Sequence, residues 1–201
     1  MQPHTLRRSG PLLPLLTVLA MAGCGPTGSG DIITETRDVA DFDRIEVSDG
    51  IVVVLTVDSG AAGSVESVYD DNLQERIVTE VEDGTLMISG SGWGSFDALG
   101  SGRKVEVSMQ ALSGLVASGG SRVTASGAID ELILDADGGA TIDLSDLIVG
   151  AMHLAVSGGA GATVNVTDAI EGDVSGGATL SVRGDPSSSD LDVSGGARIE
   201  E

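Results

Sequence analysis

The sequence predicts an all-β protein: a right-handed parallel β-helix with rungs of about 19 residues, preceded by a less regular β region. Three observations support this prediction. A Gly-Gly motif recurs at a nearly fixed spacing, apolar and polar residues alternate with a period of two around each motif, and no helical 3.6-residue stripe follows the first 23 residues.

The repeated motif is Val-Ser-Gly-Gly-Ala or a close variant. The first glycines of the five pairs are Gly119, Gly138, Gly158, Gly176 and Gly195, so successive spacings are 19, 20, 18 and 19 residues. A period near 20 residues is typical of a solenoid. Because glycine adopts positive φ without steric cost, we expect each pair to form a corner between two strands. A phosphate-binding loop would need a helix after the glycines, and none is predicted.

Two columns of residues precede the glycine pairs and predict which way the side chains face. The column four residues before each pair reads Leu115, Leu134, Leu154, Gly172 and Leu191, and we expect its leucines to face the core. The next column reads Val116, Asp135, Ala155, Asp173 and Asp192, and we expect it to face outward. Leucine-rich repeats have a similar length, but their asparagine column and helical side are missing here.

Six shorter strands are expected before residue 110, at 42–47, 51–57, 64–68, 77–81, 86–88 and 105–107. Turn signals such as Ser48-Asp49-Gly50 and Asp83-Gly84 separate them. The glycine-rich stretch 90–102 is expected to be a long loop. Its Trp93 and Phe96 either cover the solenoid or form an exposed apolar contact site for a partner.

The first 23 residues have the features of a secretory signal peptide. Arg7 and Arg8 precede an apolar run of about a dozen residues, which is too short to span a membrane. The segment Met21-Ala22-Gly23-Cys24 resembles the lipobox of bacterial lipoproteins. That resemblance implies cleavage before Cys24 and acylation of this residue, palmitate included. An ordinary signal peptide followed by an incidental cysteine is the alternative.

These features divide the chain into a signal peptide over 1–23, a flexible tether over 24–36 and one folded domain over 37–201. Residue 25 is glycine rather than aspartate, and the resemblance to Gram-negative lipoproteins therefore implies sorting to the outer membrane. Both a periplasmic and a surface-facing orientation remain open.

A second resemblance covers residues 38–200, nearly the whole predicted mature chain. It rests on Phe42-Asp-x-Ile45-x-Val47, on Gly50-Ile51-x-Val53-x-Leu55, on Asp71-Asn72-Leu73, on Gly84-Thr-Leu86-x-Ile88 and on the Ser-Gly-Gly-Ala repeats. This order resembles the auto-transporter adhesin head GIN domain family. Gly50, Ile51 and Asn72 are matched to the glycine, isoleucine and asparagine from which the name GIN is formed. The resemblance implies an exported β-helical bacterial protein of the cell envelope.

Charge and residue inventory exclude several classes of function. The chain has 31 acidic and 10 basic residues, a net charge of −21 that repels phosphate backbones, so no nucleic-acid partner is expected. Its two histidines are His4 in the leader and His153, which we expect on the surface without a partner, so a nucleophilic triad or a Cys/His zinc site is not predicted. No cofactor is expected.

The acidic residues are the one abundant reactive group. Asp135, Asp173 and Asp192 share the outward column, so a calcium site there is physically reasonable, although a solvated acidic face is the default interpretation. The pairs Asp70-Asp71 and Asp143/Asp146 are interpreted as turn residues.

The preferred hypothesis is therefore a non-enzymatic, lipid-anchored envelope module that binds protein or glycan and is adhesin-like by resemblance. The alternative is a secreted polysaccharide lyase or glycosidase, in which acids would converge in a groove with Lys104 or an arginine. The C-terminal Glu200-Glu201 is expected to guard an open strand edge by charge repulsion. A monomer that self-associates at high salt is predicted.

Overall fold

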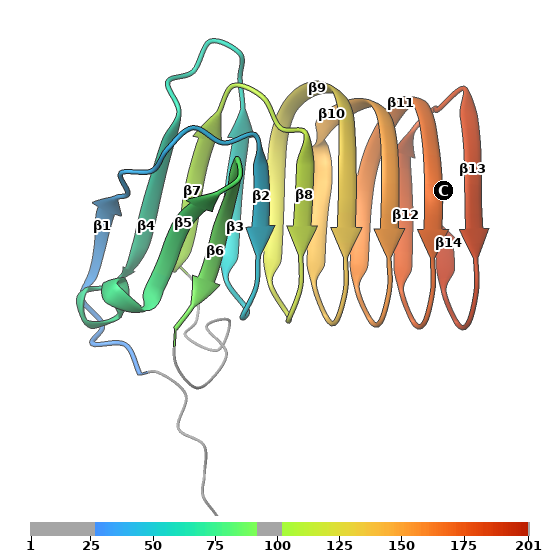
Figure 1. Ribbon diagram of the computed structural model, residues 1–201. Helices are drawn as coiled ribbons and strands as arrows, with labels where there is room; N and C mark the ends of the chain where they lie inside the picture. Colours follow the sequence, from blue (N-terminus) through green and yellow to red (C-terminus); the bar gives the residue numbers. More distant parts are fainter. Residues whose placement is uncertain (1–26, 92–101, 201) are drawn as a thin grey trace, which may run out of the picture.

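The computed structural model describes residues 27–91 and 102–200, and its secondary structure is almost entirely β (Figure 1). One short 3-10 helix, η1 (Asp71–Arg76), interrupts the strands. The strands are β1 (Ile32–Thr36), β2 (Arg44–Val47), β3 (Val52–Val57), β4 (Ser64–Asp70), β5 (Ile77–Glu82), β6 (Thr85–Gly90), β7 (Lys104–Met109), β8 (Gly114–Ala117), β9 (Arg122–Ala136), β10 (Thr141–Val156), β11 (Gly161–Val174), β12 (Thr179–Gly184), β13 (Ser188–Val193) and β14 (Arg198–Glu200).

The strands form one curled sheet with two sides. One side runs in the order β1-β4-β7-β3-β9-β10-β11-β12-β14. The other runs β5-β6-β2-β8-β9-β10-β11-β13. The long strands β9, β10 and β11 belong to both runs, because each continues around a bend from one side to the other (Figure 1). We call each passage of the chain along both sides a coil.

The C-terminal coils stack in parallel with the period that the sequence predicts. Thr141 of β10 pairs with Arg122 of β9 and with Gly161 of β11, and Thr179 of β12 pairs with Gly161 and with Arg198 of β14. Successive partners are thus 19, 20, 18 and 19 residues apart, which equals the spacing of the glycine pairs. Each coil therefore repeats the path of the one before it.

The N-terminal part departs from a uniform parallel stack. The β2–β3 coil lies between β6–β7 and β8–β9, although it precedes both in the sequence. Beyond β6 and β7 the pairing becomes antiparallel: β5 pairs with β6, β4 with β7, and β1 with β4. The all-β prediction is confirmed. The sheet is mixed, however, so a uniform right-handed parallel β-helix is not confirmed.

The core follows the columns that the sequence predicts. Leu115, Leu134 and Leu154 are 0%, 1% and 5% exposed, and Leu191 is half-buried against the core. Asp135, Asp173 and Asp192 of the next column are exposed. The six strands expected before residue 110 are present as β2 to β7. The period-two alternation is therefore the main signal for side-chain direction in this chain.

Each glycine pair lies at a corner, and the predicted turn at Ser48-Asp49-Gly50 is a further corner of the same kind. Gly119 and Gly176 have φ of +61° and +70°, in the left-handed region. Ser48-Asp49-Gly50 forms the same turn, since the Ile51 amide donates to the Ser48 carbonyl and Asp49 has φ of +60°. The β2–β3 coil is thus another copy of the repeat, with aspartate in place of the first glycine.

The segment expected to be a flexible tether is partly folded. Residues 32–36 form β1, which pairs along its whole length with β4. Before it, the Ser29 amide donates to Asn72 Oδ1 and the Gly30 amide to Asp70 Oδ1. Residues 27–36 are therefore attached to the domain rather than separate from it. Among the residues described, no helix is long and apolar enough to cross a membrane.

Candidate functional site

The candidate site is formed around residues 37–43, a segment between β1 and β2 that we call the strap. The strap crosses from one side of the sheet to the other, and hydrogen bonds hold it at both ends. At its start the Arg37 amide donates to the Val65 carbonyl of β4 over 2.8 Å. At its end the Asp43 amide donates to the Gly84 carbonyl over 3.1 Å, and the Asp43 carbonyl accepts from the Ser113 amide over 2.8 Å.

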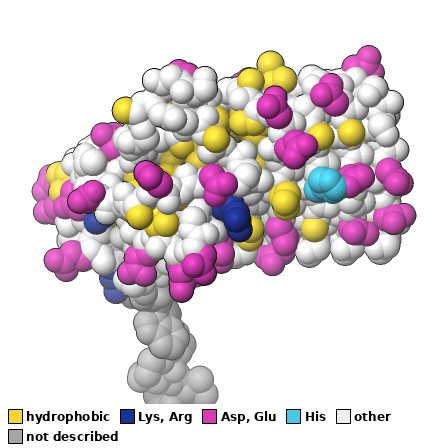
Figure 2. Space-filling model, turned by 45° about the horizontal axis from the view of Figure 1, so that its top comes forward, with side chains coloured by type: hydrophobic (Ala, Val, Ile, Leu, Met, Phe, Trp, Pro, Cys, Tyr) yellow, Lys and Arg dark blue, Asp and Glu magenta, His cyan; other side chains and the backbone are white. Residues whose placement is uncertain are grey.

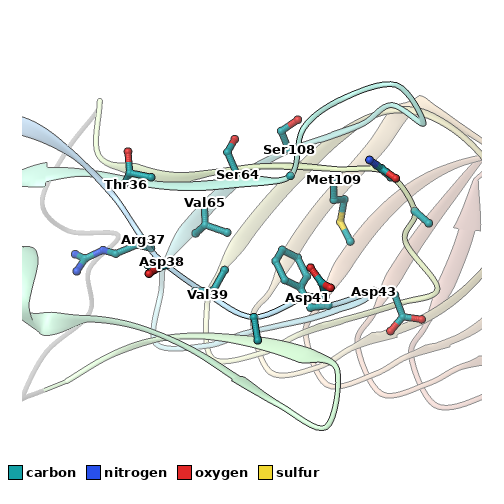
Figure 3. Close-up of a pocket in the computed structure, with 15 residues that line it drawn as sticks. Thr36, Arg37, Asp38, Val39, Asp41, Asp43, Ser64, Val65, Ser108 and Met109 are labelled. Atoms are coloured by element: carbon teal, nitrogen blue, oxygen red, sulfur yellow. The ribbon is translucent and has the colours of Figure 1, made fainter.

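A cavity of about 820 Å³ separates the strap from the ends of β4 and β7 (Figure 3). Val65 of β4 and Met109 of β7 point into this space, and Val39 and Phe42 line it from the strap. Val39 and Phe42 also pack against the hydrophobic core, which explains why an otherwise irregular segment is fixed there. The polar residues at its edge are Thr36, Asp38, Asp41, Asp43, Ser64, Ser108 and Gln110.

A second cavity, of about 570 Å³, continues the first along the bends of β9, β10 and β11. The two cavities share Asp43, Gln110 and Ala111 as lining residues, so they form one elongated depression. We call it the groove. In Figure 2 hydrophobic side chains lie in a hollow of this face, with acidic side chains around them. The large apolar residues of the second half are Leu112, Ile129 and Ile148, the last of them 49% exposed.

The groove is strongly acidic. Six carboxylates line it: Asp38, Asp41, Asp43, Asp130, Glu131 and Asp168. Among the residues that line it, the one basic side chain is Arg37, whose guanidinium points away from the cavity (Figure 3). The groove thus combines an apolar floor with an acidic rim.

Gln74 of η1 fixes the start of the strap. Its side chain is buried at 2% exposure, and its Oε1 accepts from Arg37 Nη2 over 2.9 Å and from Ser67 Oγ over 2.7 Å. Its Nε2 donates to the carbonyls of Ile33, Ser67 and Tyr69. Arg37 also donates to the Gln74 carbonyl and forms an ion pair with Glu35 at 3.4 Å. The position of the strap therefore depends on a network of buried polar groups around Gln74, in which Arg37 Nε is buried without a hydrogen-bond partner.

Asp70, expected from the sequence to be a turn residue, is instead a buried partner of Arg103. Its side chain is 0% exposed, and it accepts from both Nε and Nη2 of Arg103, the second over 2.8 Å, and from the Gly30 amide over 2.7 Å. The hydrogen bond from Arg103 holds the pKa of Asp70 down at about 2. Burial raises the pKa of the neighbouring Tyr69 to about 12. Through its hydrogen bond from Gly30, Asp70 also holds the segment before β1 against the end of β4.

The three aspartates considered for calcium do not converge. Asp173 pairs with Asp192 across β11 and β13, but Ala155 of β10 lies between Asp135 and Asp173 in the register. Among the described residues, no group of three His, Cys, Asp or Glu side chains is placed to hold a metal ion. The column is an exposed acidic face on the outside of the sheet.

His153 faces outward as predicted, but the expectation that it has no partner is wrong. Its Nδ1 lies 2.5 Å from Glu171 Oε1, because the two residues are direct cross-strand partners on β10 and β11. The side chain of His153 is 66% exposed. It is a surface residue that contacts the Glu171 carboxylate on the sheet face.

Lys104 and Arg103, basic residues that the enzyme alternative could use, lie away from the groove. Lys104 pairs with Glu106 at 2.7 Å on the same strand, and Arg103 pairs with Asp70. Neither lines the groove. Asp143 and Asp146, expected in a turn, instead lie within β10, where the register with β9 shifts. The Ser145 side chain and amide lower the pKa of the Asp143 carboxyl. Cys24, Trp93 and Phe96 lie outside the described residues.

The groove was not predicted from the sequence. Phe42 was assigned to the start of a strand, whereas β2 begins two residues later, at Arg44. The available signal was the run Asp38, Asp41 and Asp43 around Val39 and Phe42, an acidic and apolar segment between two strands. That pattern does not say which distant strands the segment crosses.

Comparisons with known proteins agree with this fold. The chain resembles a solved structure titled "putative adhesin" from Parabacteroides distasonis, with 25% identity over 87% of this chain and 74% of that one, and a TM-score of 0.74. A second, from Bacteroides fragilis and also titled "a putative adhesin", is 18% identical over 88% of this chain and 99% of that one, with a TM-score of 0.59. Among curated proteins, none matches the chain.

One family model matches the chain twice, over residues 41–126 and 104–186. Its description is "Putative auto-transporter adhesin, head GIN domain", and the two matches together span the end of the strap, from residue 41, and the strands from β2 to β12. The resemblance noted in the sequence is thereby confirmed. The chain belongs to the auto-transporter adhesin head GIN domain family.

Proposed function

We propose that this protein is a non-enzymatic binding module of the bacterial cell envelope, adhesin-like in function, that holds a protein or glycan ligand in the groove. The observation that carries the proposal is the elongated groove itself, whose two connected cavities have an apolar floor and an ordered polar rim. The adhesin description of the family and of the two solved relatives supports it. The protein acts as a monomer.

The binding role is tested with an array of glycans and envelope proteins. Ala111 is exposed and lines both cavities, so Ala111→Trp fills the middle of the groove without changing the charge. Ala155→Trp, on the exposed outer face of β10, is the matched control. We expect ligands of the wild type to bind Ala155→Trp equally and Ala111→Trp about tenfold more weakly. Ligands that bind all three proteins equally would contradict the proposal.

The module is held at the outer membrane by a lipid on Cys24, facing either the periplasm or the outside. The lipobox-like segment 21–24 supports this placement. Palmitate labelling and fractionation of the wild type and Cys24→Ala test it. We expect label and outer-membrane recovery for the wild type only. Label retained by Cys24→Ala would refute the anchor.

The coils after residue 110 are proposed to be turns of a right-handed parallel β-helix. The parallel registers from β8 to β14 and their period of 18 to 20 residues support this classification. Such a scaffold is stiff along its axis, because each coil is bonded to both neighbours, and it presents the bends of successive coils as a continuous surface. The second half of the groove lies on this surface. A crystal structure tests the proposal: successive coils that wind with a left-handed sense would contradict it.

A further inference from the structure

We propose that the groove binds an extended, positively charged peptide segment of a partner protein, about seven residues long, in which Lys or Arg alternates with apolar residues. This inference rests on the proposed binding function and names the ligand class. Three properties of the groove lead to it: its charge, its floor and its length.

The charge of the groove selects a cationic ligand. Six carboxylates line it, and the one basic lining residue, Arg37, is already bound to Gln74 and Glu35. A cationic chain would be attracted to this rim and an anionic one repelled. The net charge of −21 for the whole chain also attracts a cationic ligand from a longer distance.

The floor selects a ligand that also carries apolar side chains. Val65 and Met109 point into the first cavity, and Ile148 of the second is 49% exposed although it lies among carboxylates. Val65 and Met109 are buried beneath the surface, 1% and 3% exposed, while Val39, Phe42 and Ile129 are half-buried, so the strip is exposed mainly at Ile148. An apolar strip with a charged rim is the usual surface for an amphipathic partner. An extended chain offers alternate side chains to opposite sides, so basic residues can reach the rim while apolar ones cover the floor.

The length of the groove sets the length of the segment. The groove passes from β4 to β11, and the strand order β4-β7-β3-β9-β10-β11 contains five steps. At about 4.8 Å a step, the distance is about 24 Å, which corresponds to about seven residues of extended chain.

A glycan fits these properties less well. Sugar rings bind best against an exposed aromatic face, and Phe42, the aromatic residue among the lining residues described, is half-buried against the core. The carboxylates would be left without cationic partners. We therefore favour the peptide and treat glycan binding as an outcome of the test.

The test uses protein produced from the full 201-residue chain and a fluorescein-labelled peptide of alternating Leu and Lys, with a Leu-Glu peptide as the probe control. Anisotropy titrations are run at low salt and at 0.3 M salt. The groove variant is Asp38→Asn/Asp41→Asn/Asp130→Asn/Glu131→Gln. The matched variant is Asp135→Asn/Asp173→Asn/Asp190→Asn/Asp192→Asn, which removes four exposed charges from the outer sheet face.

We expect the Leu-Lys peptide to bind the wild type and the matched variant, and to bind the groove variant and Ala111→Trp about tenfold more weakly. Binding should weaken at high salt, because the rim charges are exposed and screened. Equal losses in the two quadruple variants would show non-specific attraction and overturn the inference.

The failure of this inference and that of the proposed function are distinguishable. If the Leu-Lys peptide does not bind but an array glycan does, and Ala111→Trp blocks that glycan, the peptide inference is wrong and the binding function stands. If Ala111→Trp affects neither ligand, both proposals are wrong.

Discussion

The backbone of Asp49 lies against Gly119: a Cβ atom on Gly119 would be 3.3 Å from the Asp49 amide nitrogen. The same contact recurs in the later coils, where glycine packs on glycine. A Cβ on Gly176 would be 2.9 Å from the Gly158 carbonyl oxygen, and that oxygen accepts from the Gly177 amide over 2.7 Å. The corners therefore form one continuous column that sets the distance between coils.

Replacement within this column should be costly. Gly176→Ala places a side chain at φ of +70° and against the Gly158 carbonyl, so we expect the free energy of unfolding to fall by about 2–3 kcal/mol. Chemical denaturation measures it. Gly139→Ala is the control, because the nearest atom to its Cβ would be 3.9 Å away. Equal losses in the two variants would show that the column does not determine stability.

Alanine replacements in the inward leucine column should lower the free energy of unfolding by amounts that follow the burial of each leucine. Leu134 is 1% exposed, and Leu134→Ala should lower the free energy of unfolding by about 3 kcal/mol, since it leaves a cavity between coils. Leu191 is half-buried on β13, so Leu191→Ala should lower the free energy of unfolding by about 1 kcal/mol. Thermal or urea unfolding of both variants tests the order, and a larger loss at Leu191 would contradict it.

The ion pair between Asp70 and Arg103 should make the fold sensitive to acid. The folded pKa of Asp70, about 2, is below its ordinary value of 3.8, so its stabilisation is present above pH 3.8 and is lost as the pH falls toward 2. Asp70→Asn should lower the free energy of unfolding by about 2 kcal/mol at pH 7.

That difference should shrink at pH 2.5, where protonation already weakens the wild type. Unfolding curves of both proteins at the two pH values measure it. A difference that stays the same at both values would mean that Asp70 is not the titrating group.

The strap should loosen when the Gln74 network is broken. Gln74→Glu replaces a donor by an acceptor facing the carbonyls of Ile33, Ser67 and Tyr69, so we expect a loss of about 2–3 kcal/mol in unfolding free energy. Gln110→Glu, the same change at an exposed position, should cost less than about 1 kcal/mol. Equal effects would show that Gln74 is not the anchor of the strap.

The coils were predictable because their signals are local. The period of the glycine pairs gives the register directly, and the alternation at Leu115, Leu134 and Leu154 gives the buried face. A turn at Ser48-Asp49-Gly50 was predicted, but its place in the repeat was not, because aspartate stands where the later copies have glycine; aspartate tolerates the left-handed region better than most residues. The repeat is therefore better defined by its backbone conformation than by its residues, because the conformation includes the Asp49 corner and the glycine pattern does not.

The groove and the mixed sheet were not predictable because their determinants are distant in sequence. Nothing near Arg37 indicates that it pairs with Gln74, 37 residues later, or that Asp70 pairs with Arg103, 33 residues later. The position of β2 between β6 and β8 likewise depends on which hydrophobic strand edges meet, not on local pattern. The sequence alone therefore predicts the C-terminal coils, but neither the strand order of the N-terminal part nor the groove.

The most direct test of the account is hydrogen exchange of the protein with and without the Leu-Lys peptide, followed by mass spectrometry. If the groove is the binding surface, amides of the strap at 37–43 and of residues 110–113 and 128–131 should exchange more slowly with the peptide present. Amides of β13 and β14 should be unchanged. Protection confined to β13, β14 or the outer sheet face, with none in the strap, would contradict the account.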